Sequence, residues 1–385
     1  MIPYGRQNIN QADIDAVVKT LKSDFLTQGP TIPAFETALA AKVGAKHAVA
    51  VNSATSALHI AVAALDLGPG DLLWTSPITF VASANCARYC GADVDFVDID
   101  AGTFNMCPNA LAAKLKQADQ SGRLPKVIVP VHMCGQSPNM MRICALARQY
   151  GVRIVEDASH AVGANYDGTP VGSSRFSDIT VFSFHPVKII TSGEGGIALT
   201  NDDDLASRLE RLRSHGITRD PQLMTSPSEG GWYYQQLELG WNYRMTDIQA
   251  TLVHSQLDRL DEFVERRNSL ADRYDDLLGE SALTLPEREP LAHSSFHLYV
   301  VRLAEPDADR HQKVFAHLRA SGIGVNVHYI PVHLQPYYAS MGFCHGDFPT
   351  SEAYYQRAIS IPLYPDLTQD EQDHVAMMLM AAMAI

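Results

Sequence analysis

Lys188 is the residue whose type and position first suggest chemistry. It lies in the stretch SFHPVKIITSGEGG, residues 183–196, and no other lysine occurs between Lys126 and Lys313. The apolar run DITVFSF, residues 178–184, predicts a buried strand, so this lysine follows the end of a core strand. Most lysines occupy solvated surfaces, whereas this one is surrounded by His, Pro, Ser, Thr and Gly. A lysine in such a place is a candidate nucleophile.

A carboxylate ends the preceding predicted strand. Asp157 closes the run RIVED, residues 153–157, and by itself it could be a surface residue, a helix cap or the partner of a buried cation. Together, Asp157 and Lys188 meet the needs of a pyridoxal 5'-phosphate site. A buried lysine readily becomes a neutral amine, which condenses with the cofactor aldehyde as a Schiff base. The carboxylate keeps the pyridine nitrogen protonated, so that the ring can accept electrons.

The cofactor phosphate also needs a cradle. The stretch NSATSALH, residues 52–59, offers a strand end, the hydroxyls of Thr55 and Ser56, and the free N–H groups of a helix start. The same pattern also serves merely to cap helices. Ser183 could donate a further hydroxyl, and Phe80 could stack on the pyridine ring, although an ordinary core phenylalanine would fit the sequence equally well.

The elements that must position these side chains follow an alternating pattern. Short apolar runs predict strands, and helical patterns separate most of them. The predicted strands lie within residues 47–53, 71–77, 93–100, 126–133, 153–160, 178–185 and 195–202. The alternation predicts an α/β fold with a mostly parallel sheet covered on both faces. Ligands bind such sheets at the carboxyl ends of the strands.

The pattern changes after Gly230 and Gly231. The following residues predict a long helix, a strand, a charged helix, a second strand and further helices, the first four at about 246–280, 295–303, 308–321 and 323–329. We therefore expect two domains: a cofactor-binding large domain with an N-terminal substrate segment, residues 1–250, and a smaller C-terminal α/β domain, residues 251–385.

The overall composition excludes several classes of protein. The net charge of −13 argues against general binding of nucleic acid or anionic membranes. The N-terminus MIPYGRQNIN has no signal-peptide pattern, and the longest apolar run, residues 375–385, is too short to span a bilayer. The six cysteines form no CxxC pair, so we expect no metal site and reduced thiols in a cytoplasmic protein.

Seven motifs occur in a fixed order along nearly the whole chain. They are NSATSALH, SPITFVAS, VEDASHAVGA, SFHPVKIITSGEGG, RSHGI, WNYRM and VHYIPVHLQPYY. Together they resemble the sugar aminotransferases of the DegT/DnrJ/EryC1/StrS family. The resemblance implies an aspartate-aminotransferase-like fold, a pyridoxal phosphate cofactor and a homodimer.

The resemblance also assigns roles to individual residues. Lys188 would hold the cofactor as a Schiff base, Asp157 would pair with its ring nitrogen, and His160 would orient the cofactor or Asp157. Asn242 would reach the cofactor phosphate of the other subunit, so that the two sites are shared. The implied cofactor-binding residues are Ala54, Thr55, Ser56, Phe80, Asp157, His160, Ser183, Lys188 and Asn242. The implied substrate-binding residues are Tyr4, Asp24, Phe25, Leu26, Thr27, Ala54, Ser183, Asn242, Asn326, Val327, His328 and Tyr329.

The stretches IPYGRQ, DFLTQGP, EDASHA and FHPVK look like one branch of this family. That branch forms UDP-4-amino-4,6-dideoxy-N-acetyl-β-L-altrosamine, in the pathway to pseudaminic acid. The implied reaction moves an amine from L-glutamate to C4 of a UDP-linked 4-keto-6-deoxy-N-acetylhexosamine. Ile189 and Ile190 depart from the Pro-Ile expected after the lysine.

Other functions stay open at this point. The enzyme could be a C4 or C3 aminotransferase acting on the D-sugar epimer, or on a GDP- or dTDP-linked keto-sugar. Another pyridoxal phosphate enzyme, such as a desulfurase or decarboxylase, would not account for the full motif series. A non-catalytic protein that binds the cofactor or a sugar nucleotide is a further alternative, against which the presence of both Lys188 and Asp157 argues.

Overall fold

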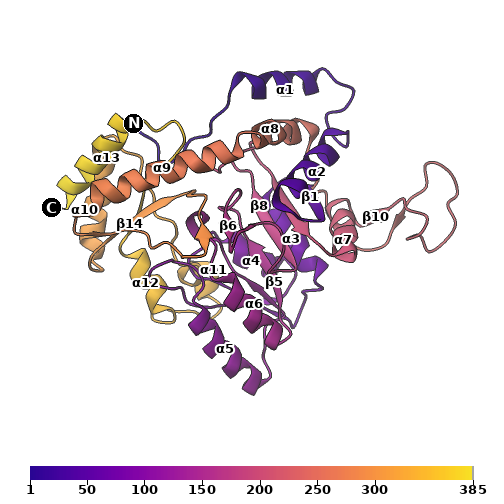
Figure 1. The fold of residues 1–385 in the computed structure, drawn as a ribbon. Helices are drawn as coiled ribbons and strands as arrows, with labels where there is room; N and C mark the ends of the chain where they lie inside the picture. Colours follow the sequence, from indigo (N-terminus) through magenta and orange to yellow (C-terminus); the bar gives the residue numbers. More distant parts are fainter. Residues whose placement is uncertain (384–385) are drawn as a thin grey trace.

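A seven-stranded sheet forms the centre of the molecule (Figure 1). The computed structural model describes residues 1–383, and the strand order is β1-β9-β8-β5-β4-β2-β3. Only β9 runs against its neighbours, which confirms the predicted mostly parallel sheet. Each predicted run contains one strand: β1 His47–Val51, β2 Leu72–Thr75, β3 Asp93–Phe96, β4 Val127–Val129, β5 Arg153–Asp157, β8 Ile179–Ser183 and β9 Gly196–Thr200.

Helices cover both faces of this sheet because successive strand residues point to opposite sides. Val49 and Val51 pack with one core cluster, whereas Ala50 packs with another. The first cluster includes α3 Ala54–Ala64, α4 Ala82–Tyr89 and α7 Asp203–Arg213. The opposite face is covered by α2 Thr31–Val43, α5 Pro108–Ser121, α6 Met140–Gln149 and α8 Asp247–Leu257.

The C-terminal part has its own sheet and core. Strand β14 pairs with β12 on one side and with β15 on the other, and a separate cluster of buried apolar residues surrounds it. Its elements are α9 Leu260–Leu278, β12 Leu283–Thr284, β14 Tyr299–Leu303, α10 Ala308–Ala320, β15 Ala358–Ile361 and α13 Gln369–Ala382. A further cluster of buried apolar residues contains side chains from both parts, such as Ile78 and Leu298. The division into domains at residue 250 therefore stays a prediction.

Smaller elements complete the chain. They are α1 Gln11–Leu21, β6 Asn165–Tyr166, β7 Thr169–Pro170, β10 Ile217–Thr218, β11 Gln235–Gln236, β13 Ala292–His293, α11 Pro336–Ala339, α12 Pro349–Tyr355 and the 3-10 turns Met133–Gly135 and Val332–Leu334. The hairpin that carries β10 and β11 projects away from the body of the molecule (Figure 1). Within residues 1–383, no helix is long and apolar enough to cross a membrane. The end of the apolar run 375–385 lies outside the described residues.

Three predicted elements differ from the observed ones. The helix predicted at 246–280 is two helices, because the backbone at Arg259 leaves helical geometry between α8 and α9. The strand predicted at 295–303 begins only at Tyr299, since Phe296 has a positive φ of 44° that a strand cannot contain. The strand predicted at 323–329 was wrong. That segment makes only isolated bridges, because the N–H of Val327 bonds to the Asn326 side chain and leaves the ladder.

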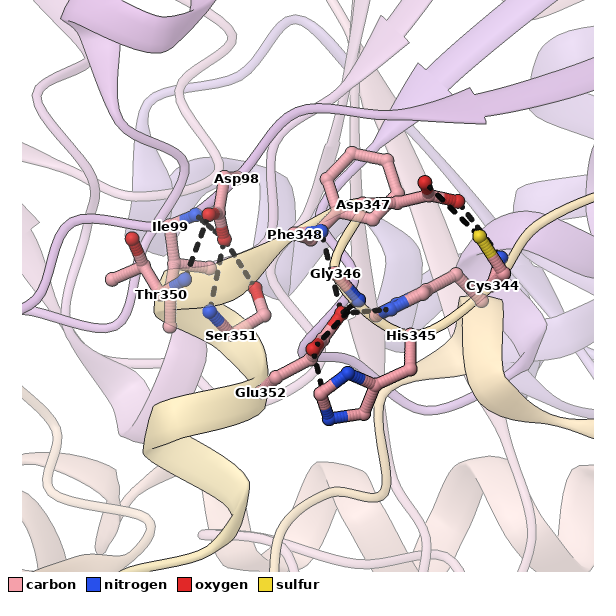
Figure 2. A network of polar contacts seen from close by, with 11 residues as sticks. Asp98, Ile99, Cys344, His345, Gly346, Asp347, Phe348, Thr350, Ser351 and Glu352 are labelled. Atoms are coloured by element: carbon pink, nitrogen blue, oxygen red, sulfur yellow. Dashed lines mark hydrogen bonds and ion pairs between the residues drawn. The ribbon is translucent and has the colours of Figure 1, made fainter. Parts of the chain in front are cut away.

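Two carboxylates hold the start of helix α12, and one of them follows the end of β3 (Figure 2). The carboxylate of Asp98 accepts hydrogen bonds from the N–H groups of Thr350 and Ser351, both at 3.0 Å. Glu352 lies in the first turn of the same helix and accepts from the N–H of Gly346 at 2.9 Å and from the buried ring of His333 at 3.0 Å. The Asp98 bonds fix the C-terminal segment against the large sheet, and the Glu352 bonds fix the segment that precedes α12.

Candidate active site

A cavity of about 460 Å³ opens where β1, β5 and β8 end. These strands run in the same direction, so their carboxyl ends meet at one edge of the sheet. Residues from the N-terminal segment and from 326–329 close the other side. The volume is typical of sites that enclose a cofactor or a small substrate.

Lys188 lines this cavity from the loop that follows β8. The neighbouring Ile189 and Ile190, at 4% and 0% exposure, are embedded in the core and fix the backbone of the lysine. The two isoleucines that depart from the expected Pro-Ile therefore serve as core anchors. Burial lowers the pKa of the Lys188 amine to about 8, and the charge of Asp157 opposes that shift. At this pKa roughly a tenth of the amine is neutral and nucleophilic at pH 7, far more than for a lysine with its ordinary pKa of 10.5.

Asp157 is the last residue of β5 and is held by two serine hydroxyls. Ser83 Oγ donates to Asp157 Oδ2 at 2.5 Å, and Ser159 Oγ donates to Asp157 Oδ1 at 2.6 Å. Thr79 in turn contacts Ser83 Oγ at 2.7 Å. Asp157 is therefore neither a surface residue nor a helix cap, since it is 5% exposed and lines the cavity. Such bonds to an ionised carboxylate are strong and fix its orientation.

The sequence analysis did not identify Ser83 or Ser159 as part of the site. Ser159 lies two residues after Asp157 within the EDASH motif, and Ser83 lies one helical turn after Phe80 within SPITFVAS. These short spacings from Asp157 and Phe80 were the only local indication that the two hydroxyls belong to the site. Their contact with Asp157 could not be read from the sequence, because 74 residues separate Ser83 from it.

Three histidines and two tyrosines lie close together in the lining of the cavity. His160 Nε2 lies 3.1 Å from the hydroxyl of Tyr329, and its ring lies 4.4 Å from the ring of His297. His328 contacts the ring of Tyr4 at 5.4 Å and the hydroxyl of Ser360 at 2.7 Å. Burial lowers the pKa of His160 well below its usual range and that of His328 to about 3, with the charge of Lys188 adding to both effects. These rings are therefore neutral.

The N-terminus of α3 faces the same cavity. Ser53 caps this helix by accepting from the N–H of Ser56, and Ala54 and Thr55 line the cavity. A helix leaves the N–H groups of its first turn without internal partners, so this end can bind a phosphate. The hydroxyl of Ser56 donates to Asn52 at 2.7 Å, and Ser56 does not line the cavity. Gly196 passes close beneath, where a Cβ would lie 2.5 Å from the N atom of Ala54.

Two further predicted cofactor residues also line the cavity. Ser183, the last residue of β8, is 7% exposed. Phe80 is 57% exposed, so it is not an ordinary core residue. An aromatic face that is open to a cavity is available for stacking on a planar ring.

The predicted substrate residues fall into two groups. Tyr4, Ala54, Ser183, Asn326, His328 and Tyr329 line the cavity. The segment 24–27 and Asn242 are exposed and do not line it, and neither does Val327. Within one chain, the structure therefore brings together only part of the predicted substrate contacts.

These features fit pyridoxal phosphate. The cavity contains a lysine whose amine is partly neutral, an anchored carboxylate, an open aromatic face and a helix N-terminus with free N–H groups. Each of these four features corresponds to one part of the cofactor: the aldehyde, the pyridine nitrogen, the ring face and the phosphate.

Comparison with known proteins agrees with this geometry. The model of the DegT/DnrJ/EryC1/StrS aminotransferase family matches residues 7–380. SpsC of Bacillus subtilis, a spore coat polysaccharide biosynthesis protein, is 40% identical over 378 residues, which are 97% of this chain and 95% of SpsC. The UDP-4-amino-4,6-dideoxy-N-acetyl-beta-L-altrosamine transaminase of Campylobacter jejuni is 38% identical over 371 residues, covering 95% of this chain and 93% of that protein.

A solved structure confirms the fold class and the cofactor. Spr1654 from Streptococcus pneumoniae, in its PMP form, superimposes with a TM-score of 0.91 at 30% identity and covers 99% of both chains. The same protein has also been solved in a PLP form. The chain studied here belongs to the DegT/DnrJ/EryC1/StrS aminotransferase family and is a sugar aminotransferase that depends on pyridoxal phosphate.

Proposed function

We propose that this enzyme transfers an amino group from L-glutamate to C4 of a UDP-linked 4-keto-6-deoxy-N-acetylhexosamine. The product would be UDP-4-amino-4,6-dideoxy-N-acetyl-β-L-altrosamine, in the pathway to pseudaminic acid. The observation that carries this proposal is the 38% identity, over 95% of the chain, to a transaminase named for that compound. The motifs that indicated the same branch of the family support it.

The roles of the cavity residues follow from their positions. Lys188 would bind the cofactor covalently, and Asp157 would accept a hydrogen bond from its pyridine nitrogen. The first turn of α3, with Ala54 and Thr55, would hold the phosphate, and Phe80 would cover the ring. When bound, pyridoxal phosphate supplies an aldehyde that condenses with amines and a ring that accepts electrons.

The lysine would also act as the general base. Its amine is free whenever the cofactor carries the transferred amino group, and its pKa of about 8 is close to the pH at which it must work. It would remove a proton from one carbon and return it to another, so that the proton remains on Lys188 Nζ between the two steps. Ser83 and Ser159 would keep the Asp157 carboxylate oriented meanwhile.

Substrate contacts would come from two sides of the cavity. Tyr4, Asn326, His328 and Tyr329 line the cavity together with the first turn of α3, so they can meet the sugar ring. We propose that the exposed segment 24–27 binds the nucleotide, as the family resemblance implies. Binding of the nucleotide by this remote segment would orient the sugar in the cavity. It would thereby fix which face of C4 receives the amine.

We further propose a homodimer in which Asn242 acts on the cofactor phosphate of the partner. Among the described residues that line the cavity, Lys188 is the only lysine or arginine, although the phosphate and the nucleotide are anionic. A second chain would supply the missing polar groups. Asn242 is exposed, while the adjacent Trp241 and Tyr243 stack on each other and contact His59. The exposed Trp232 of the projecting hairpin suits such a contact.

Two experiments test the covalent link and the shared site. Borohydride reduction should fix the cofactor onto Lys188, and label on any other lysine would contradict the assignment. Lys188→Ala and Asn242→Ala proteins should each be inactive. After subunit exchange, a mixture should regain about a quarter of the parent activity, since half of the dimers would contain one complete site of two. No recovery despite exchange would exclude a shared site.

The substrate is tested with a panel of UDP-, GDP- and dTDP-linked keto-sugars and L-glutamate. The proposal predicts the highest kcat/KM for UDP-2-acetamido-2,6-dideoxy-β-L-arabino-hex-4-ulose. The D-sugar ketone should react more slowly but measurably, since misplaced contacts of this kind cost about 1–3 kcal/mol. A higher kcat/KM for the D-sugar ketone would remove the pseudaminic acid assignment and leave the sugar aminotransferase intact.

A further inference from the structure

His297 is part of the cavity but belongs to none of the stretches from which the site was predicted. It lies two residues before β14 and is 4% exposed. Its Nε2 atom lies 3.4 Å from Nζ of Lys188. Its other ring nitrogen, Nδ1, is buried and has no hydrogen-bond partner within the described residues. The lysine amine is therefore the one hydrogen-bond partner of this imidazole within the described residues.

The surroundings of His297 keep its ring neutral. The ring of His160 lies 4.4 Å away, and Arg267 lies behind it and donates to its backbone carbonyl at 3.3 Å. Burial, and then the charges of Lys188, His160, Arg267 and His328, hold the pKa of His297 well below its usual range. A neutral imidazole offers one unprotonated nitrogen, and with Nε2 facing an amine that nitrogen is an acceptor.

We propose that His297 is a positioning residue for Lys188, whose free amine donates a hydrogen bond to Nε2 of the neutral imidazole. The proposal rests on the function assigned above and deepens it. The bond holds the amine in the cavity while it is detached from the cofactor. It also stabilises the ammonium form while Lys188 carries the proton between two carbons. No proton passes to His297, because its ring stays neutral throughout.

No other group around the lysine can replace this acceptor directly. The acidic groups that share the cavity are Asp157 and Glu194, of which the first is occupied by its two serines. The other histidines are His160, His185 and His328, and the phenols are Tyr4 and Tyr329. Of all these groups, His297 alone lies within hydrogen-bond distance of the Lys188 amine in the described residues.

The proposal predicts a shift in the titration of the lysine. In His297→Phe an aromatic ring still fills the space, but the acceptor is gone and the ammonium form loses its bond. The titration midpoint of Lys188 should then fall by about one pH unit, the size expected for a lost hydrogen bond to a charged group. In His297→Gln the amide oxygen can still accept, so the midpoint should stay near the parent value.

The midpoint is measured without turnover. The full-length chain, freed of cofactor, is treated with cyanate at a series of pH values, and carbamoylation of Lys188 is quantified by mass spectrometry. His333→Phe is the matched control, because His333 is also fully buried but bonds to Glu352 outside the cavity. It should lower the melting temperature and leave the Lys188 midpoint unchanged. An unchanged midpoint in His297→Phe, or equal shifts in His297→Phe and His297→Gln, overturns the proposal.

Two further measurements keep the outcome unambiguous. In the unmutated protein, nitrogen-15 spectra must show the ring of His297 protonated on Nδ1 and unprotonated on Nε2, and a proton on Nε2 overturns the proposal even if the variants fail to fold. Borohydride reduction of the cofactor-loaded variants separates this inference from the proposed function. Label on Lys188 together with an unshifted midpoint removes only the role of His297, whereas label on another lysine removes both.

Discussion

The exchange of Asp157 for asparagine tests the site most directly. Asparagine has nearly the same shape, so its side chain can still contact the hydroxyls of Ser83 and Ser159, which lie 2.5 and 2.6 Å from the carboxylate. We therefore expect the fold and the cofactor content to be retained. What is lost is the negative charge, and a neutral amide cannot keep the pyridine nitrogen of the cofactor protonated.

The magnitude follows from burial. Asp157 is 5% exposed, so little solvent is available to replace the missing charge. Removing one partner of a buried ion pair costs about 3–5 kcal/mol. At about 1.4 kcal/mol for each factor of ten, the rate of amino transfer should fall by about 10²- to 10⁴-fold.

Glu156→Gln is the matched control. Glu156 precedes Asp157 on β5 and is equally buried, but alternation along the strand turns it toward His132, Ser177 and Thr180 instead of the cavity. Burial raises the pKa of Glu156, but the bonds from these three residues outweigh it and leave the pKa below its usual value. This variant should be less stable and should keep most of its turnover.

The assay is a rapid-mixing half-reaction with L-glutamate, followed through the absorbance of the cofactor. Cofactor content and melting temperature are measured on the same samples. The reasoning is refuted if Asp157→Asn reacts within about tenfold of the parent rate, since a buried ion pair should be worth more than that. It is equally refuted if Glu156→Gln loses as much activity as Asp157→Asn.

Three further changes have defined outcomes. Gly196→Ala would bring a Cβ to 2.5 Å from the N atom of Ala54, so the phosphate site must shift; the Kd for pyridoxal phosphate, measured by fluorescence quenching, should rise about tenfold. Tyr329→Phe removes the contact with His160 at 3.1 Å and should slow turnover about threefold to tenfold without changing the fold. Glu352→Gln should destabilise the protein at pH 7 by about 1–3 kcal/mol in urea unfolding. Burial raises the pKa of Glu352, but the bonds from His333 and from the N–H groups of Gly346 and Phe348 outweigh burial and leave the pKa below its ordinary value of 4.5. This stabilisation is therefore present above pH 4.5 and is lost as pH falls through the lower folded pKa. The parent should therefore approach the variant in stability at acid pH, and a constant difference would contradict the assignment.

The sequence by itself determined the elements and the principal chemistry of this protein. All seven strands of the large sheet could be predicted because an apolar run bounded by turns is a local property of the chain. Lys188 and Asp157 could be identified because Asp157 ends such a run and Lys188 follows another within a few residues, and parallel strands bring these ends to one edge.

Only the tertiary structure decided which further groups meet at that edge. His297 contacts Lys188 across 109 residues, and Ser83 contacts Asp157 across 74. No local pattern distinguishes either residue, because a single histidine or serine before or after an apolar run is common in any protein. The segment 323–329 was misjudged for the same reason: its alternating pattern suits a strand, but whether a strand forms depends on a distant partner that supplies hydrogen bonds. Local periodicity constrains the backbone of each element, whereas contacts between side chains far apart in sequence depend on how the packed elements approach one another.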